Sequence, residues 1–303
     1  MDGLPIGSIR PTLMPNARPV LRFAPSPNGE LHLGHALSAL TGWATAQALG
    51  GRFLLRIEDI DIARTRPEYV AGFFRDLAWL GLSWEEPVLF QSTRFAAYAE
   101  AARRLSALDV LYPCFATRSE IEAAADASRR DPDGAPLYPG LWRGRDPCEL
   151  AARRQAGEPF ALRLDMEAAL ALARERLGGK PLTFLEQAAD GSRREVAADP
   201  ASWGDAVLIR KDTPASYHLA VVVDDAFQGI THVTRGRDLF AATDIHRLLQ
   251  VLLDLPAPIY AHHALVTDKT GRKLAKSDRD TSLAQLRAEG ATPADIRRRL
   301  GLG

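Results

Sequence analysis

The chain has 303 residues and a formal net charge of zero, so no overall field attracts it to nucleic acid, and any RNA contact must come from local patches. Its hydrophobic content of 46% and charged content of 25% are typical of a globular protein with a substantial core. The apolar runs are too short to span a bilayer, and two cysteines, Cys114 and Cys148, are too few for a disulfide framework. We therefore expect a cytoplasmic protein without a membrane partner.

Residues 1–18 are expected to form a flexible tail, because this proline-containing stretch lacks the apolar segment of a signal peptide. Val20–Ala24 then reads as a strand, and apolar residues at helical spacing predict a helix from Leu33 to Ala48. The turn between them ends at Gly34, which lets backbone come close to a ligand. A helix start suits a phosphate, and His32 and His35 lie there one turn apart, able to donate hydrogen bonds to phosphate oxygens.

A second strand follows at Arg52–Ile57 and runs directly into Glu58, Asp59 and Asp61. Strand, helix and strand form a βαβ unit, whose ligand sites lie at the carboxyl ends of the strands. The three acidic residues are therefore expected at the edge of the sheet where a ligand binds.

The remaining pattern alternates helices and strands. Helices are predicted at Pro67–Leu82, Ser92–Leu108 with Ser92 as the cap, Ile121–Arg130, Glu167–Leu177, Asp238–Leu253 and Ala291–Leu300. Strands are predicted at Leu111–Phe115, Ala206–Arg210 and Ile259–Val266. The stretch Asp131–Pro147 reads as a loop, and Val221–Val223 reads as core.

Two strings far apart in the chain resemble the paired motifs of class I aminoacyl-tRNA synthetases. The first is His32-Leu33-Gly34-His35, which follows Arg22-Phe23-Ala24-Pro25-Ser26-Pro27 as in the glutamyl members of that family. The second is Lys273-Leu274-Ala275-Lys276-Ser277. The two motifs occur in the same order as in the family, so a chance match of both strings is an unsatisfactory explanation.

The resemblance implies a fold as well as an activity. We expect an α/β, Rossmann-like nucleotide-binding fold with an inserted α+β subdomain and a short helical C-terminal stub in place of an anticodon-binding domain. The first half of the catalytic domain is expected at residues 19–110, the insertion at 111–200, and the second half at 201–303.

The same resemblance implies the roles of particular residues. Glutamate is expected to contact Arg22, Ala24, Ser26, Glu58, Tyr217 and Arg235. ATP, carrying Mg²⁺, is expected to contact His32, Gly34, His35, Lys276 and Ser277, and the catalytic groups are His32, His35 and Lys276 with weaker help from Lys273.

Charge chemistry agrees with glutamate as the ligand. Two guanidinium groups and one carboxylate match a molecule with two carboxylates and one ammonium, and an unpaired buried arginine disfavours glutamine. The residues alone leave open which arginine binds which carboxylate, and the resemblance implies Arg22 for the side chain.

One family feature is altered. Short glutamyl-type relatives often carry a zinc-like set of three cysteines and a tyrosine, whereas this chain has Cys114, Ala116, Tyr138 and Trp142 at those positions. Alanine and tryptophan cannot ligate zinc, so we expect no zinc and apolar packing of Trp142 instead.

Few residues follow Ser277, too few for a further domain. The chain thus resembles the truncated glutamyl-Q tRNA(Asp) synthetases, which implies tRNA-independent activation of L-glutamate and transfer to queuosine in tRNA(Asp), by a monomer. Two alternatives stay open: a discriminating glutamyl-tRNA synthetase working with a separate anticodon-binding partner, and a non-catalytic nucleotide-binding regulator.

Overall fold

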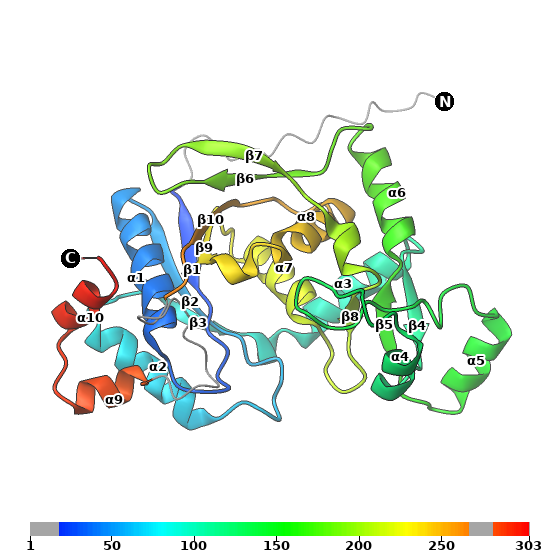
Figure 1. Ribbon diagram of the computed structural model, residues 1–303, viewed down its shortest axis with the longest axis horizontal. Coiled ribbons are helices and arrows are strands. Elements are labelled where there is room, and N and C mark those ends of the chain that lie inside the picture. The colour runs from blue at the N-terminus through cyan, green and yellow to red at the C-terminus, as the bar shows by residue number, and fades with distance from the viewer. Residues whose placement is uncertain (1–17, 267–280, 303) are drawn as a thin grey trace.

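The computed structural model describes residues 18–266 and 281–302 (Figure 1). The strands are β1 (Val20–Phe23), β2 (Arg52–Ile57), β3 (Glu85–Phe90), β4 (Leu111–Cys114), β5 (Ala161–Leu164), β6 (Thr183–Gln187), β7 (Arg193–Ala197), β8 (Val207–Ile209), β9 (His232–Gly236) and β10 (Ile259–His263). The helices are α1 (Leu33–Ala48), α2 (Pro67–Trp79), α3 (Phe95–Ser106), α4 (Arg118–Ala124), α5 (Pro147–Gln155), α6 (Met166–Arg176), α7 (Tyr217–Phe227), α8 (Ala242–Leu253), α9 (Leu283–Ala288) and α10 (Pro293–Arg299).

The centre of the molecule is a parallel α/β arrangement built from two separate parts of the chain. Strand β1 pairs in parallel with β2, and β2 with β3, so the predicted βαβ unit is confirmed. Strand β10 pairs in parallel with β9 and with β6. The two groups meet where the Thr231 N–H donates to the Val20 carbonyl at 2.9 Å, which sets β1 beside β9 (Figure 1).

A second, antiparallel sheet of order β4-β5-β8 lies at one end of the molecule beside α4 and α5 (Figure 1). It supplies the α+β character expected for the insertion. The hairpin β6–β7 also comes from the stretch 111–200, but β6 pairs with β10 at Tyr260 and Glu186. The exact division into halves and insertion stays a prediction.

Two large apolar clusters hold the arrangement together. One surrounds α8 and includes residues from α3, α6 and α7. The other joins α1, β1, β2 and α2 to Leu283, Leu286 and Ile296 of the last two helices. The C-terminal helices therefore pack against the first part of the chain, as Figure 1 shows at its lower left.

Several predicted boundaries are wrong. The helix expected to begin at Asp238 begins at Ala242 after a short 3₁₀ turn, and Leu239 is only half-buried because this segment lines a cavity. Ser92 does not cap α3: its hydroxyl donates to Asp59 at 2.6 Å, and the helix begins at Phe95.

Other differences are smaller in consequence. The helix from Pro67 ends at Trp79, the helix expected at Ile121–Arg130 is α4, and the last strand ends at His263. The C-terminal stretch holds two helices, α9 and α10, where one was expected. Within the described ranges, no helix is both long and apolar enough to cross a membrane.

Candidate active site

The start of α1 is organised by its two histidines. The Gly34 N–H donates to His32 Nδ1 at 3.0 Å, and the His32 N–H donates to His35 Nδ1 at 3.3 Å. Both Nδ1 atoms are acceptors, so each ring carries its proton on Nε2. The rings lie 4.0 Å apart between centroids. The turn thus combines a positive helix end with a pair of imidazole N–H donors, a combination suited to a phosphate.

Gly34 is required by this geometry. A Cβ at residue 34 would lie 2.9 Å from His32 Cε1. Any side chain there would push the ring away and break the cap that fixes its tautomer.

The histidines open onto a cavity of about 480 Å³ that collects the predicted site residues. Every expected glutamate or ATP residue within the described ranges lines it: Arg22, Ala24, Ser26, His32, Gly34, His35, Glu58, Tyr217 and Arg235. Lys273, Lys276 and Ser277 lie outside the described residues. Segments more than 200 residues apart in sequence therefore meet in one space.

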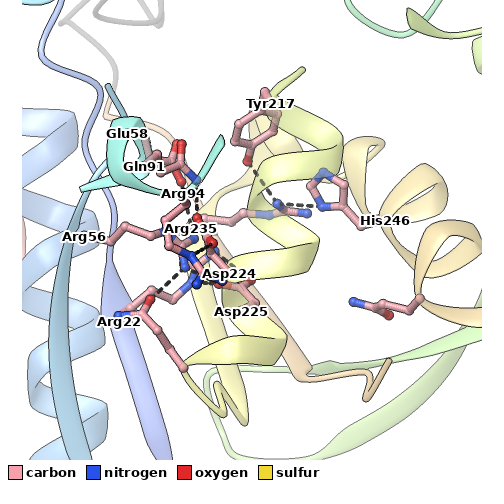
Figure 2. A network of polar contacts seen from close by, with 12 residues as sticks. Arg22, Arg56, Glu58, Gln91, Arg94, Tyr217, Asp224, Asp225, Arg235 and His246 are labelled. Carbon is pink, nitrogen blue, oxygen red and sulfur yellow. Dashed lines mark hydrogen bonds and ion pairs between the residues drawn. The ribbon is translucent and has the colours of Figure 1, made fainter. Parts of the chain in front are cut away.

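A buried ion-pair network lies beside the cavity and contributes Arg22 and Glu58 to its lining (Figure 2). Asp225 accepts from Arg22 Nε at 3.0 Å and Nη2 at 3.3 Å, and from Arg56 Nη1 at 2.8 Å. Arg56 reaches Glu58 through Nη2 at 3.3 Å. The Arg56 side chain is completely buried, and the other three are at most one-tenth exposed. Strands β1 and β2 and helix α7 are thus tied together by charge.

The two carboxyl groups of this network have opposite pKa shifts. Burial raises the pKa of Glu58 above its usual value, although Arg56 and Arg22 act against it. Burial would also raise the pKa of Asp225, but Arg22 and Arg56 outweigh it and hold the pKa below its usual range. Glu58 is therefore the carboxylate whose charge is less fully compensated by its arginine neighbours, and a further cation such as an ammonium would stabilise its charged form.

Arg56 and Asp225 were missed by the sequence reasoning. Arg56 reads as part of an apolar strand, and Asp225 as the end of an apolar run. One signal was available: Arg56 and Glu58 are two residues apart at a strand end, which puts both side chains on one face.

The second predicted arginine has different neighbours. Arg235 donates from Nη2 to Thr243 Oγ1 at 2.8 Å, from Nε to His262 Nε2 at 3.1 Å, and from Nη1 to the Tyr217 hydroxyl at 3.4 Å. Tyr217 begins α7, where Ser216 caps the helix by accepting from the Leu219 N–H. Figure 2 shows Tyr217 and Arg235 pointing toward each other.

The altered zinc positions form a small apolar cluster. Cys114, Ala116 and Tyr138 are buried, and Leu141 and Trp142 pack against them. The Cys114 thiol donates to the Tyr138 hydroxyl at 3.3 Å, which in turn accepts from the Trp142 N–H at 2.9 Å. The predicted packing of Trp142 is confirmed.

The donor set at these positions does not fit zinc. One thiol and one phenol are too few for a structural zinc site, which takes four ligands. In the part of the chain that the structure describes, no group of three or more His, Cys, Asp or Glu side chains is arranged so that it could hold a metal ion. The absence of zinc stays a prediction.

A helix start suited to a phosphate, next to a cavity lined by two arginines and a carboxylate, has the features required of an enzyme that joins an amino acid to a nucleotide. The family model for "tRNA synthetases class I (E and Q), catalytic domain" matches residues 20–302, and the chain belongs to this family.

Individual relatives narrow the comparison. The chain is 47% identical over 287 residues to the glutamyl-Q tRNA(Asp) synthetase of Rhodobacter capsulatus, an alignment that covers 93% of this chain and 100% of the relative. It is 39% identical to the protein of the same name from Symbiobacterium thermophilum, over 91% of this chain and 83% of the relative.

A solved structure supports the fold. The glutamate-tRNA synthetase of Elizabethkingia anophelis superposes with a TM-score of 0.74 at 26% identity, over 94% of this chain and 62% of that one. The chain thus spans less than two thirds of that synthetase.

Proposed function

We propose that this chain activates L-glutamate with ATP, without requiring tRNA, and then transfers the glutamyl group to the queuosine base in the anticodon of tRNA(Asp). The observation that carries the proposal is the 47% identity along the whole length of a glutamyl-Q tRNA(Asp) synthetase. The cavity supports it, because its side chains suit both glutamate and a nucleotide phosphate.

The charged groups on the cavity wall assign glutamate an orientation. Glu58 binds the ammonium, because a buried carboxylate with a raised pKa gains most from a cationic partner. Arg22 and Arg235 bind the two carboxylates, and the family resemblance favours Arg22 for the side chain. Glutamine would leave a buried guanidinium facing a neutral amide, which disfavours it by about 1.5–3 kcal/mol.

Activation then needs no nucleophile from the protein. An oxygen of the glutamate α-carboxylate attacks the α-phosphorus of ATP, and the bond from that phosphorus to the bridging oxygen of pyrophosphate breaks. His32 and His35 donate their Nε2 protons as hydrogen bonds to phosphate oxygens at the helix start, where charge builds up. A Mg²⁺ ion carried by the nucleotide would offset the charge of the leaving pyrophosphate, and Lys276 is proposed to assist from the second motif.

Transfer follows from the mixed anhydride. A hydroxyl of the acceptor attacks the glutamyl carbonyl and loses its proton, an ester forms, and AMP leaves with the electron pair of the broken carbon–oxygen bond. An acceptor in RNA fits the family, and a cytoplasmic monomer remains our expectation.

The test separates the two steps. We expect glutamate-dependent exchange of pyrophosphate into ATP in the absence of tRNA, and then stable glutamylation of tRNA(Asp) that contains queuosine but not of the same tRNA lacking it. Glutamylation of tRNA(Glu) at its 3′ end would instead favour a glutamyl-tRNA synthetase that works with a partner. If no exchange occurs either without tRNA or with any tRNA added, the non-catalytic regulator would be favoured.

A further inference from the structure

The two cavity arginines differ in how their charge is balanced. Arg22 forms a two-point ion pair with Asp225. Arg235 is equally buried, at 5% exposed, yet within the described residues all its hydrogen bonds go to uncharged groups. Its positive charge is therefore left for a ligand.

A pair of histidines supports Arg235 from behind. His246 of α8 lies with Nδ1 3.4 Å from Arg235 Nη1, and with Nε2 3.2 Å from Nδ1 of His218 on α7. A guanidinium can only donate, so His246 Nδ1 accepts and its proton sits on Nε2. That proton is then donated to His218 Nδ1, so the positions of both protons follow from the guanidinium.

The surroundings of His218 and His246 favour the neutral form of both rings. Burial, followed by the nearby charge of Arg235, lowers the pKa of His218 to about 4 and the pKa of His246 well below its usual value. On the far side, His262 accepts from Arg235 through Nε2 and meets Glu186 through Nδ1 at 2.9 Å. The Glu186 carboxylate is thus separated from Arg235 by an imidazole ring.

We propose that His246, held by His218, is a positioning residue that orients Arg235 for a glutamate carboxylate without neutralising its charge. A carboxylate at residue 246 would hold the guanidinium as firmly but would compete with the substrate. This inference rests on the proposed function, because it takes glutamate as the ligand.

Three variants at one position separate orientation from charge. His246→Gln keeps a neutral acceptor, His246→Leu removes the acceptor, and His246→Glu adds a negative charge to a side chain of nearly the same shape as glutamine. In pyrophosphate exchange, we expect the KM for the substrate glutamate to rise less than about 3-fold in His246→Gln and about 3- to 10-fold in His246→Leu. In His246→Glu it should rise about 10- to 100-fold.

The readouts exclude a merely structural effect. The KM for ATP should change less than about 3-fold in all three variants, and calorimetric titration with glutamate alone should reproduce the order. The matched controls are His232→Gln and His232→Glu: His232 is a buried histidine on the same strand as Arg235 and does not line the cavity. Neither control should change glutamate affinity.

The outcomes are distinct. Wild-type protein without glutamate-dependent exchange overturns the proposed function itself. If the wild-type protein catalyses exchange but His246→Gln and His246→Glu bind the substrate glutamate equally well, the proposed role of His246 is overturned. If His246→Glu does not fold, wild-type affinity for glutamate in His246→Leu would likewise overturn the role of His246.

Discussion

Replacing Asp225 by asparagine should both destabilise the protein and weaken glutamate binding. The carboxylate accepts three hydrogen bonds, at 2.8, 3.0 and 3.3 Å, from two buried guanidinium groups. An asparagine of the same shape keeps one oxygen acceptor but turns an NH₂ group toward the arginines, and both lose their shared counter-charge.

The expected size follows from the burial of the network. Removing one partner of a buried ion pair costs about 3–5 kcal/mol, because the remaining charge stays buried without compensation. At about 2–3 °C per kcal/mol for a chain of this size, the melting temperature should fall by roughly 6–15 °C. Arg22 should also lose its orientation, so the KM for glutamate should rise about 10-fold or more.

The pH dependence gives an independent check. The pKa of Asp225 is held below its usual range, so the stability it contributes is complete above the unfolded pKa of about 4 and is lost as the pH falls through the folded value. The difference in melting temperature between wild type and Asp225→Asn should therefore shrink in acid.

A matched control makes the same chemical change on the surface. Asp212 pairs with Arg210 at 3.4 Å, but its side chain is 72% exposed. Asp212→Asn should change stability by less than about 0.5 kcal/mol. A melting temperature of Asp225→Asn within about 2 °C of wild type, as expected for a surface change, together with an unaltered KM for glutamate, would refute the role of Asp225.

Four further results are expected. Because burial raises the pKa of Glu58, the KM for glutamate should increase as the pH falls toward that value, and a flat profile that matches Glu58→Gln would contradict the ammonium role. His32→Ala should lower kcat about 100-fold and cost about 1 kcal/mol of stability, whereas His32→Asn should restore the melting temperature through its cap but not kcat. Lys276→Ala should abolish adenylate formation, as measured by pyrophosphate exchange, and leave the melting temperature unchanged. Trp142→Ala should destabilise the protein by about 1–3 kcal/mol through lost ring packing on Phe115, while a zinc chelator leaves wild-type melting unchanged.

Local sequence signals predicted the first part of the fold well. The helix over Leu33–Ala48 and the strand over Arg52–Ile57 match the structure residue for residue, because each combines a clear apolar period with a glycine or acidic boundary. The same signals failed where tertiary contacts decide. The stretch Asp238–Leu253 has helical spacing throughout, yet its first residues line the cavity instead.

The expected site residues that the structure describes line one cavity, but the hydrogen bonds and ion pairs behind them were not predicted. Motif residues such as His32 and Glu58 stand in recognisable strings, and a resemblance transfers their roles. Asp225 and His246 have no such local mark: one ends an apolar run, and the other lies inside a leucine-rich helix. Their partners are 203, 169 and 11 residues away, so only the folded chain brings them together.

Adjacent acidic residues on α7 explain why the site and the fold depend on each other. Asp225 binds Arg22 and Arg56 of the first two strands, whereas Asp224 accepts from Gln91, Arg94 and Tyr98 at 2.6–3.0 Å. Successive helical residues point about 100° apart, so one helix reaches two different segments of the first part of the chain (Figure 2). Of the two, Asp225 is the one that contacts Arg22 and, through Arg56, reaches Glu58, and both of these residues are proposed to bind glutamate. Loss of Asp224 should therefore act on stability with little effect on glutamate KM, while loss of Asp225 should act on both.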